Sequence, residues 1–189
     1  MAGSCSPRPS CFRPVEPESA QLKLKDSAKG AEKDQLQWKW TKGAATTLED
    51  FADPVTSDGL VLCIFDRSQT PPSLLFQAIV PPDGMCGTKQ KPCWVVGSKS
   101  KNFKFASKTG NSNGVTGLTL TPGERGKAKI EFKAKGAALT NRPFGLPALP
   151  PPLPLTVQLQ SENGNCWEAS YAQSGVKKNT DEEFDAKSE

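Results

Sequence analysis

Residues 127–136 read KAKIEFKAKG and have the cleanest alternation of apolar and polar side chains in the chain. In an extended strand, successive side chains point to opposite faces, so this stretch has one apolar face and one lysine-rich face. The apolar face must be buried against another layer of the protein. The stretch therefore predicts an antiparallel sheet with one face in a core and the other in solvent.

The same pattern recurs along the chain. It is present in residues 21–26, 35–40, 117–122, 155–161, 166–172 and 182–188, and shorter strands are expected at 94–99 and 102–108. Residues 60–66, LVLCIFD, are apolar on both faces, which indicates a central strand with residues 73–80 as its partner. About ten short strands separated by turn signals predict an all-β fold. We expect an antiparallel β-sandwich, immunoglobulin-like or jelly-roll-like, with an irregular N-terminal arm.

Two segments stand apart from this pattern. Residues 1–18 are rich in proline, serine and arginine and are expected to form an arm or tether, followed by a single domain over residues 19–189. Residues 142–154 hold six prolines, so they cannot form a helix or a central strand. We expect them to cross between the two sheets as an extended surface segment.

The chain contains six cysteines and no histidine. An even cysteine count suggests an oxidising compartment and disulfides rather than reactive thiols. The expected pairs are Cys86–Cys93 across a loop, Cys63–Cys166 between strands and Cys5–Cys11 on the arm. A zinc site is the alternative, but the chain has no CxxC spacing and no histidine, so no metal is expected.

Signs of catalysis are few. Histidine, the commonest general base, is absent, and neither a GxSxG motif nor a phosphate-binding GxxxxGK[ST] loop is present. Carboxylates are plentiful, but no spacing selects a pair suited to glycoside hydrolysis. We therefore expect a protein that is not an enzyme and needs no cofactor.

Positive charge gathers in one part of the chain. Residues 95–136 hold nine lysines and arginines against two acids, a net charge of +7, whereas residues 160–189 have a net charge of −4. The candidate residues for binding a polyanion or a partner are Lys104, Lys108, Lys127, Lys129, Lys133 and Lys135. Adjacent like charges repel unless a ligand neutralises them. The alternative is a solvated face whose lysines prevent aggregation, and this reading is favoured.

The four tryptophans, Trp38, Trp40, Trp94 and Trp167, also have two readings. They could form a platform on which sugars stack, or they could fill the core. Three of them share the phase of the apolar residues in their strands, which favours the core.

Taken together, several segments resemble a known type of module. They are WKWTKGAATTLEDFADP, LCIFD, CGTKQKPCW, NFKF, GKAKIEFKAKG, LPLTVQLQ, NCWEASY and FDAKS, and they cover about residues 20–189. In this order they resemble a β-rich accessory module of large exported bacterial proteins that has no established activity. The resemblance implies export and a β-rich fold only.

These observations predict a non-catalytic, exported structural or assembly module, such as a subunit of a cell-surface or extracellular assembly. Its partners would be other copies of itself or envelope and surface proteins. The alternative function is binding of a carbohydrate or polyanion, such as an anionic polysaccharide, on the lysine-rich face. Nucleic acid is disfavoured because no recognised motif is present. No apolar run is long enough to span a membrane as a helix. The cysteine count and the resemblance give the expected location, which is extracellular, periplasmic or on the cell surface.

Overall fold

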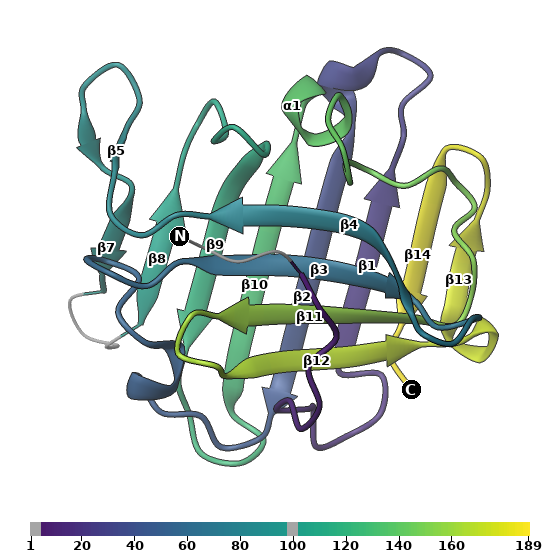
Figure 1. The fold of residues 1–189 in the computed structure, drawn as a ribbon, viewed down its shortest axis with the longest axis horizontal. Helices are drawn as coiled ribbons and strands as arrows, with labels where there is room; N and C mark the ends of the chain where they lie inside the picture. Colours follow the sequence, from purple (N-terminus) through teal and green to yellow (C-terminus); the bar gives the residue numbers. More distant parts are fainter. Residues whose placement is uncertain (1–4, 98–101) are drawn as a thin grey trace.

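Two β-sheets packed face to face form the protein (Figure 1). The computed structural model describes residues 5–97 and 102–189. The larger sheet has eight strands in the order β13-β14-β1-β2-β10-β9-β8-β7, and the smaller sheet has four in the order β12-β11-β3-β4. All pairs of neighbouring strands are antiparallel, and the strands of the smaller sheet cross those of the larger. The predicted all-β sandwich is confirmed.

The elements have the following bounds. The larger sheet consists of β1 (Ala20–Lys25), β2 (Gln35–Gly43), β7 (Trp94–Val96), β8 (Phe103–Ala106), β9 (Val115–Thr121), β10 (Ala128–Lys135), β13 (Val176–Asn179) and β14 (Glu183–Lys187). The smaller sheet consists of β3 (Leu60–Asp66), β4 (Ser73–Val80), β11 (Leu155–Ser161) and β12 (Cys166–Tyr171). A separate hairpin pairs β5 (Met85–Cys86) with β6 (Lys91–Pro92), and the one described α-helix is α1 (Ala137–Thr140).

Most of the strands expected from alternation are present. The predicted partners β3 and β4 pair, and the hairpins β1–β2 and β11–β12 form in register. The short strands β5, β6 and β13 were not expected, because two to four residues are too few to show a period. Part of the strand expected over residues 94–99 lies outside the described residues, and β7 ends at Val96.

The core lies between the two sheets, and all four tryptophan side chains are buried in it. The indole Nε1 of Trp38 donates a hydrogen bond to the Tyr171 hydroxyl at 2.9 Å. The Nε1 of Trp40 donates to the backbone carbonyl of Glu168 at 3.0 Å. Both bonds connect β2 of the larger sheet to β12 of the smaller one, so the sheets are joined by polar contacts as well as by apolar packing. The predicted core role of the tryptophans is confirmed.

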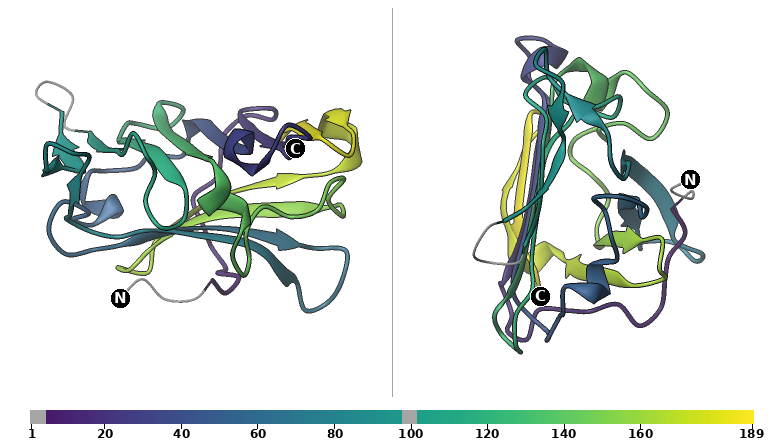
Figure 2. Two further views of the ribbon diagram at one scale, coloured as in Figure 1. Left: turned by 90° about the horizontal axis from the view of Figure 1, so that it is seen from above. Right: turned by 90° about the vertical axis from the view of Figure 1, so that its left-hand side faces the viewer.

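The N-terminal arm forms a third layer over the outer face of the smaller sheet (Figure 2). Arg8 and Gln158 of β11 exchange two hydrogen bonds: the Arg8 backbone N–H donates to Gln158 Oε1 at 3.1 Å, and Gln158 Nε2 donates to the Arg8 carbonyl at 2.9 Å. Gln160 Nε2 donates to the Ser6 carbonyl at 2.7 Å. Both glutamines are 98% buried because the arm covers them. The arm thus supplies the partners that buried amide groups need.

Further along, Phe12 of the arm forms an isolated parallel β-bridge with Trp167 of β12. The backbone N–H of Phe12 donates to the Cys166 carbonyl at 2.8 Å, and the Glu168 N–H donates to the Phe12 carbonyl at 2.8 Å. The Phe12 ring stacks on Trp167 with 5.7 Å between ring centroids. Arg13 forms an ion pair with Glu168, which is buried. Residues 5–14 therefore lie against the body of the protein along their length.

Three disulfides are present, and two of the predicted pairings are wrong. Cys86–Cys93 forms as expected, but Cys5 bonds to Cys63 and Cys11 bonds to Cys166. Strand β11 lies between β3 and β12, which separates Cys63 from Cys166 by two strand spacings, or about 9–10 Å. A disulfide needs Cα atoms within about 7 Å. Each of these strand cysteines bonds instead to the arm that crosses above it.

The proline-rich segment leads from β10 of the larger sheet to β11 of the smaller sheet. It is fastened to the edge strand β4 through Gln77, whose carbonyl accepts from Arg142 Nη1 at 2.5 Å and whose N–H donates to the Phe144 carbonyl at 3.0 Å. The Arg142 guanidinium lies 5.2 Å from the centroid of the Phe76 ring. Burial lowers the pKa of Arg142 below its ordinary value.

The single tyrosine gives a test of the core. Burial raises the pKa of the Tyr171 hydroxyl, and the hydrogen bond from Trp38 offsets this only in part. The folded-state pKa lies above the ordinary value of about 10, so this group's contribution to stability is complete below that pH and is lost as the pH rises above it. In an alkaline titration, we expect tyrosinate absorbance to appear only together with loss of the tryptophan near-UV circular dichroism. Reversible ionisation near pH 10 in the folded protein would contradict this packing.

The disulfides should differ in their effect on stability. Cys11–Cys166 closes a loop with a sequence separation of 155, and Cys86–Cys93 one of 7. In the chain-entropy model these are worth about 5 and about 2 kcal/mol. We therefore expect Cys11→Ser with Cys166→Ser to lower the free energy of unfolding in urea more than Cys86→Ser with Cys93→Ser. The reverse order would show that the arm contributes little to the native fold.

Candidate functional site: a lysine-lined groove

A groove of about 1150 Å³ opens where the β5–β6 hairpin meets one end of the larger sheet. One side is formed by hairpin residues 86–89 and 91–92, and the other by β2, β8, β9, β10 and the residues that follow β8. Figure 1 shows the hairpin at one corner of the sandwich, next to β7 and β8. Most of the lining is exposed or half-buried, and only neighbours such as Leu36 and Ala134 belong to the core.

Five lysines line this groove. They are Lys89, Lys91, Lys108, Lys133 and Lys135. None of the described residues that line it is acidic. Within residues 5–97 and 102–189, only Lys133 of the five forms an ion pair. The groove therefore concentrates positive charge that the protein itself leaves largely uncompensated.

The hairpin brings two of these lysines to the groove. Its short strands pair Met85 with Pro92 and Cys86 with Lys91, and the Cys86–Cys93 disulfide closes its base. At the tip, the Gln90 N–H donates to the Gly87 carbonyl at 3.2 Å. Gly87 has a φ of +72°, a conformation that favours glycine, so the sequence CGTKQKPC suits this tight turn.

The sheet side of the groove alternates cations with amides. On the outer face, Lys133 of β10 lies opposite Gln37 of β2, and Lys135 lies opposite Gln35. Side chains directly opposite each other on neighbouring antiparallel strands have Cβ atoms about 4.5–5.5 Å apart. Each of these two lysines thus stands beside a glutamine amide.

Glu131 limits the positive charge on the rest of the sheet face. Its carboxylate lies 3.0 Å from Lys133 Nζ and 4.0 Å from Lys39 Nζ. It also accepts a hydrogen bond from Gln37 Nε2 at 3.2 Å. The lysines of β10 therefore do not form one continuous row of positive charge. Glu131 lies between Lys129 and the two lysines that line the groove, Lys133 and Lys135.

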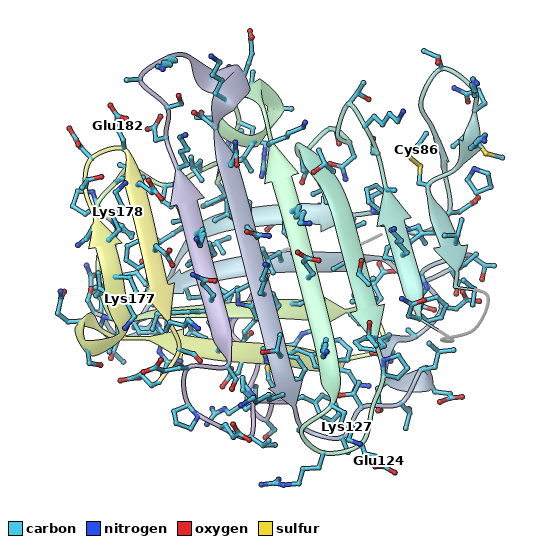
Figure 3. The ribbon with its side chains drawn as sticks, turned by 180° about the vertical axis from the view of Figure 1, so that it is seen from behind. Cys86, Glu124, Lys127, Lys177, Lys178 and Glu182 are labelled. Atoms are coloured by element: carbon cyan, nitrogen blue, oxygen red, sulfur yellow. A yellow bond between two sulfur atoms is a disulfide. The ribbon has the colours of Figure 1, made fainter. Side chains whose placement is uncertain are left out.

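The six lysines predicted from the sequence to bind a polyanion or a partner do not lie in one site. Lys108, Lys133 and Lys135 line the groove, whereas Lys104, Lys127 and Lys129 do not. Figure 3 shows Lys127 and Glu124 at the opposite end of the sheet from Cys86. Lys89 and Lys91 were missed because alternation cannot select residues in a loop. Their place between two cysteines that close a hairpin was the available signal.

Nearby cations offset part of the negative charge of the acidic C-terminal segment, residues 160–189. Three of its carboxylates are paired locally: Glu183 with Lys178, Asp185 with Lys23, and Glu168 with Arg13. Figure 3 places Lys177, Lys178 and Glu182 together at the edge opposite Cys86. Two of these partners, Lys23 and Arg13, lie outside residues 160–189, so they offset part of the net charge of −4 counted along that segment.

In the described part of the chain, no cluster of three or more histidine, cysteine, aspartate or glutamate residues is arranged to hold a metal ion. All six cysteines are in disulfides. Among the described residues, none belongs to a helix long and apolar enough to cross a membrane.

Comparisons of the chain with protein families, with curated proteins and with solved structures found no match. The resemblance to an accessory module of exported bacterial proteins therefore stays a prediction.

Proposed function

We propose that this protein is a non-catalytic, exported binding module whose groove holds a segment of an anionic polymer. The observation that carries this proposal is the set of five lysines around a groove with no acidic lining residue. The volume of about 1150 Å³ exceeds the range typical of compact small-molecule sites, and the groove is open to solvent. An extended ligand fits these features better than a small anion.

Electrostatics explains why such a ligand would bind. Lys133 and Lys135 are two residues apart on one strand, so their Cβ atoms are separated by about 6–7 Å. Two unit charges at this distance in water repel by about 0.6 kcal/mol. Each further lysine in the groove adds to this repulsion, and an anionic chain relieves it. Such binding is expected to weaken as salt screens the charges.

The disulfides support the exported location. Three cross-links with no free thiol indicate an oxidising environment, which in most organisms lies outside the cytosol. Two of them hold the arm on the smaller sheet, and the third holds the hairpin beside the groove. A cross-linked sandwich of this kind suits a binding role outside the cell.

The assembly role stays a prediction and is less well supported. In the larger sheet, the edge strand β13 has four residues, two of which are Lys177 and Lys178, and the other edge strand, β7, has three. Short edges that carry lysine discourage pairing between sheets of different molecules. Size-exclusion chromatography across a salt series tests this point. A stable head-to-tail oligomer at low salt would favour assembly over ligand binding.

A charge-matched pair of variants tests the proposed function. We expect Lys108→Gln with Lys135→Gln to weaken binding of dextran sulfate by about tenfold, because two exposed charge contacts are lost. The slope of log affinity against log salt should become shallower by about two units. Isothermal titration calorimetry at several salt concentrations measures both.

The control is Lys127→Gln with Lys129→Gln, which removes the same net charge outside the groove. It should bind almost as well as the native protein. Equal losses in the two double variants would mean that overall charge, and not the groove, attracts the polymer. No measurable binding by the native protein at low salt would refute the proposed function.

A further inference from the structure

The groove offers hydrogen-bonding groups as well as charge. Besides the five lysines, its lining includes Gln35, Gln37, Thr88 and Thr116. Amides and hydroxyls donate and accept hydrogen bonds with neutral polar groups, and lysine only donates. A ligand that carries hydroxyls beside its anionic groups would use both kinds of residue.

The glutamines are placed to act together with the lysines. The pairs Lys133–Gln37 and Lys135–Gln35 are direct cross-strand neighbours, and they follow one another along β10 and β2. Gln35 is exposed and Gln37 is half-buried. Each pair places an amide beside a cation; Lys133 and Gln37 also contact Glu131, whereas Lys135 forms no ion pair with a described residue. A sugar residue that bears both an acid group and hydroxyls is complementary to such a pair.

The aromatic residues argue against a nucleic acid. Proteins that hold single-stranded nucleic acid without sequence preference stack bases on exposed aromatic rings. Here Trp38, Trp40, Trp94, Trp167 and Tyr171 are all buried in the core. None of the described lining residues of the groove is aromatic. The lysines would attract the phosphates of a nucleic acid, but the groove offers no aromatic ring on which its bases could stack.

From these features we infer that the groove binds an acidic polysaccharide, with the lysines contacting its carboxylate or sulfate groups and Gln35 and Gln37 contacting its hydroxyls. This inference rests on the proposed function and names the ligand class for the same site. Inorganic polyphosphate has no sugar hydroxyls, so only the lysines would contribute to its binding affinity.

The experiment compares five probes at one ionic strength: dextran sulfate, polygalacturonate, inorganic polyphosphate, single-stranded DNA and neutral dextran. We expect at least one of the two acidic polysaccharides to bind about tenfold more tightly, per charge, than the polyphosphate and the DNA. Neutral dextran should not bind measurably, because the lysine contacts would be missing.

The variant Gln35→Ala with Gln37→Ala leaves the net charge unchanged. It should weaken polysaccharide binding about tenfold, since two neutral hydrogen bonds are lost, whereas the affinities for polyphosphate and DNA should change by less than about twofold, because the only charged group that loses a hydrogen bond is Glu131 beside the groove. Its control is Gln69→Ala with Gln173→Ala, two exposed glutamines that do not line the groove. This control should bind every probe as the native protein does.

The outcomes separate the two proposals. Equal binding of all polyanions per charge, tighter binding of DNA or polyphosphate, or unchanged polysaccharide binding by the Gln35/Gln37 variant would each overturn the polysaccharide assignment and leave a polyanion site. Binding of none of the charged probes would overturn both proposals.

Discussion

The smaller sheet must be buried on both faces, and much of the structure follows from this constraint. Its inner face packs on the tryptophans of the larger sheet, and its outer face has Val61, Cys63 and Phe65 on β3. On β11, the outer face carries Gln158 and Gln160, whose buried amides need partners. The N-terminal arm meets both demands, since it covers the apolar residues and hydrogen-bonds to the glutamines. The disulfides Cys5–Cys63 and Cys11–Cys166 keep it in place.

The candidate site likewise combines the packed body of the sandwich with a peripheral segment that a disulfide holds in place. The body of the sandwich provides a rigid floor, in which β2 and β10 are joined to the core by Trp38, Trp40 and Phe132. The wall of the groove is a small hairpin closed by the Cys86–Cys93 disulfide. Charge is therefore carried by exposed positions whose backbone is held by buried neighbours. Such an arrangement suits a binding surface, because little of the backbone has to be ordered on ligand binding and the entropic cost of binding is therefore small.

Local patterns were informative about strands and much less so about the site. The alternation in residues 127–136 predicted β10 and its lysine face correctly. It did not show that Lys133 and Lys135 end beside the hairpin while Lys127 lies at the far end of the sheet. Nor did it show that Glu131 pairs with a lysine from β2. These relations depend on which strands are neighbours, and strand order is set by long-range packing that a single pattern does not report.

The sequence by itself determined the fold class, the positions of the longer strands, the buried role of the tryptophans and the use of cysteines as cross-links. Each of these follows from periodicity or residue chemistry within a few positions of the chain. Only the tertiary structure decided the partners of Cys63 and Cys166, the covering role of the arm, and which lysines share a groove. For the cysteines the physical reason is that β11 inserts between β3 and β12, and for the lysines it is that the β5–β6 hairpin lies over one end of the larger sheet. The insertion of β11 separates Cys63 from Cys166, which the sequence predicted to pair, and each of them bonds instead to a cysteine of the N-terminal arm.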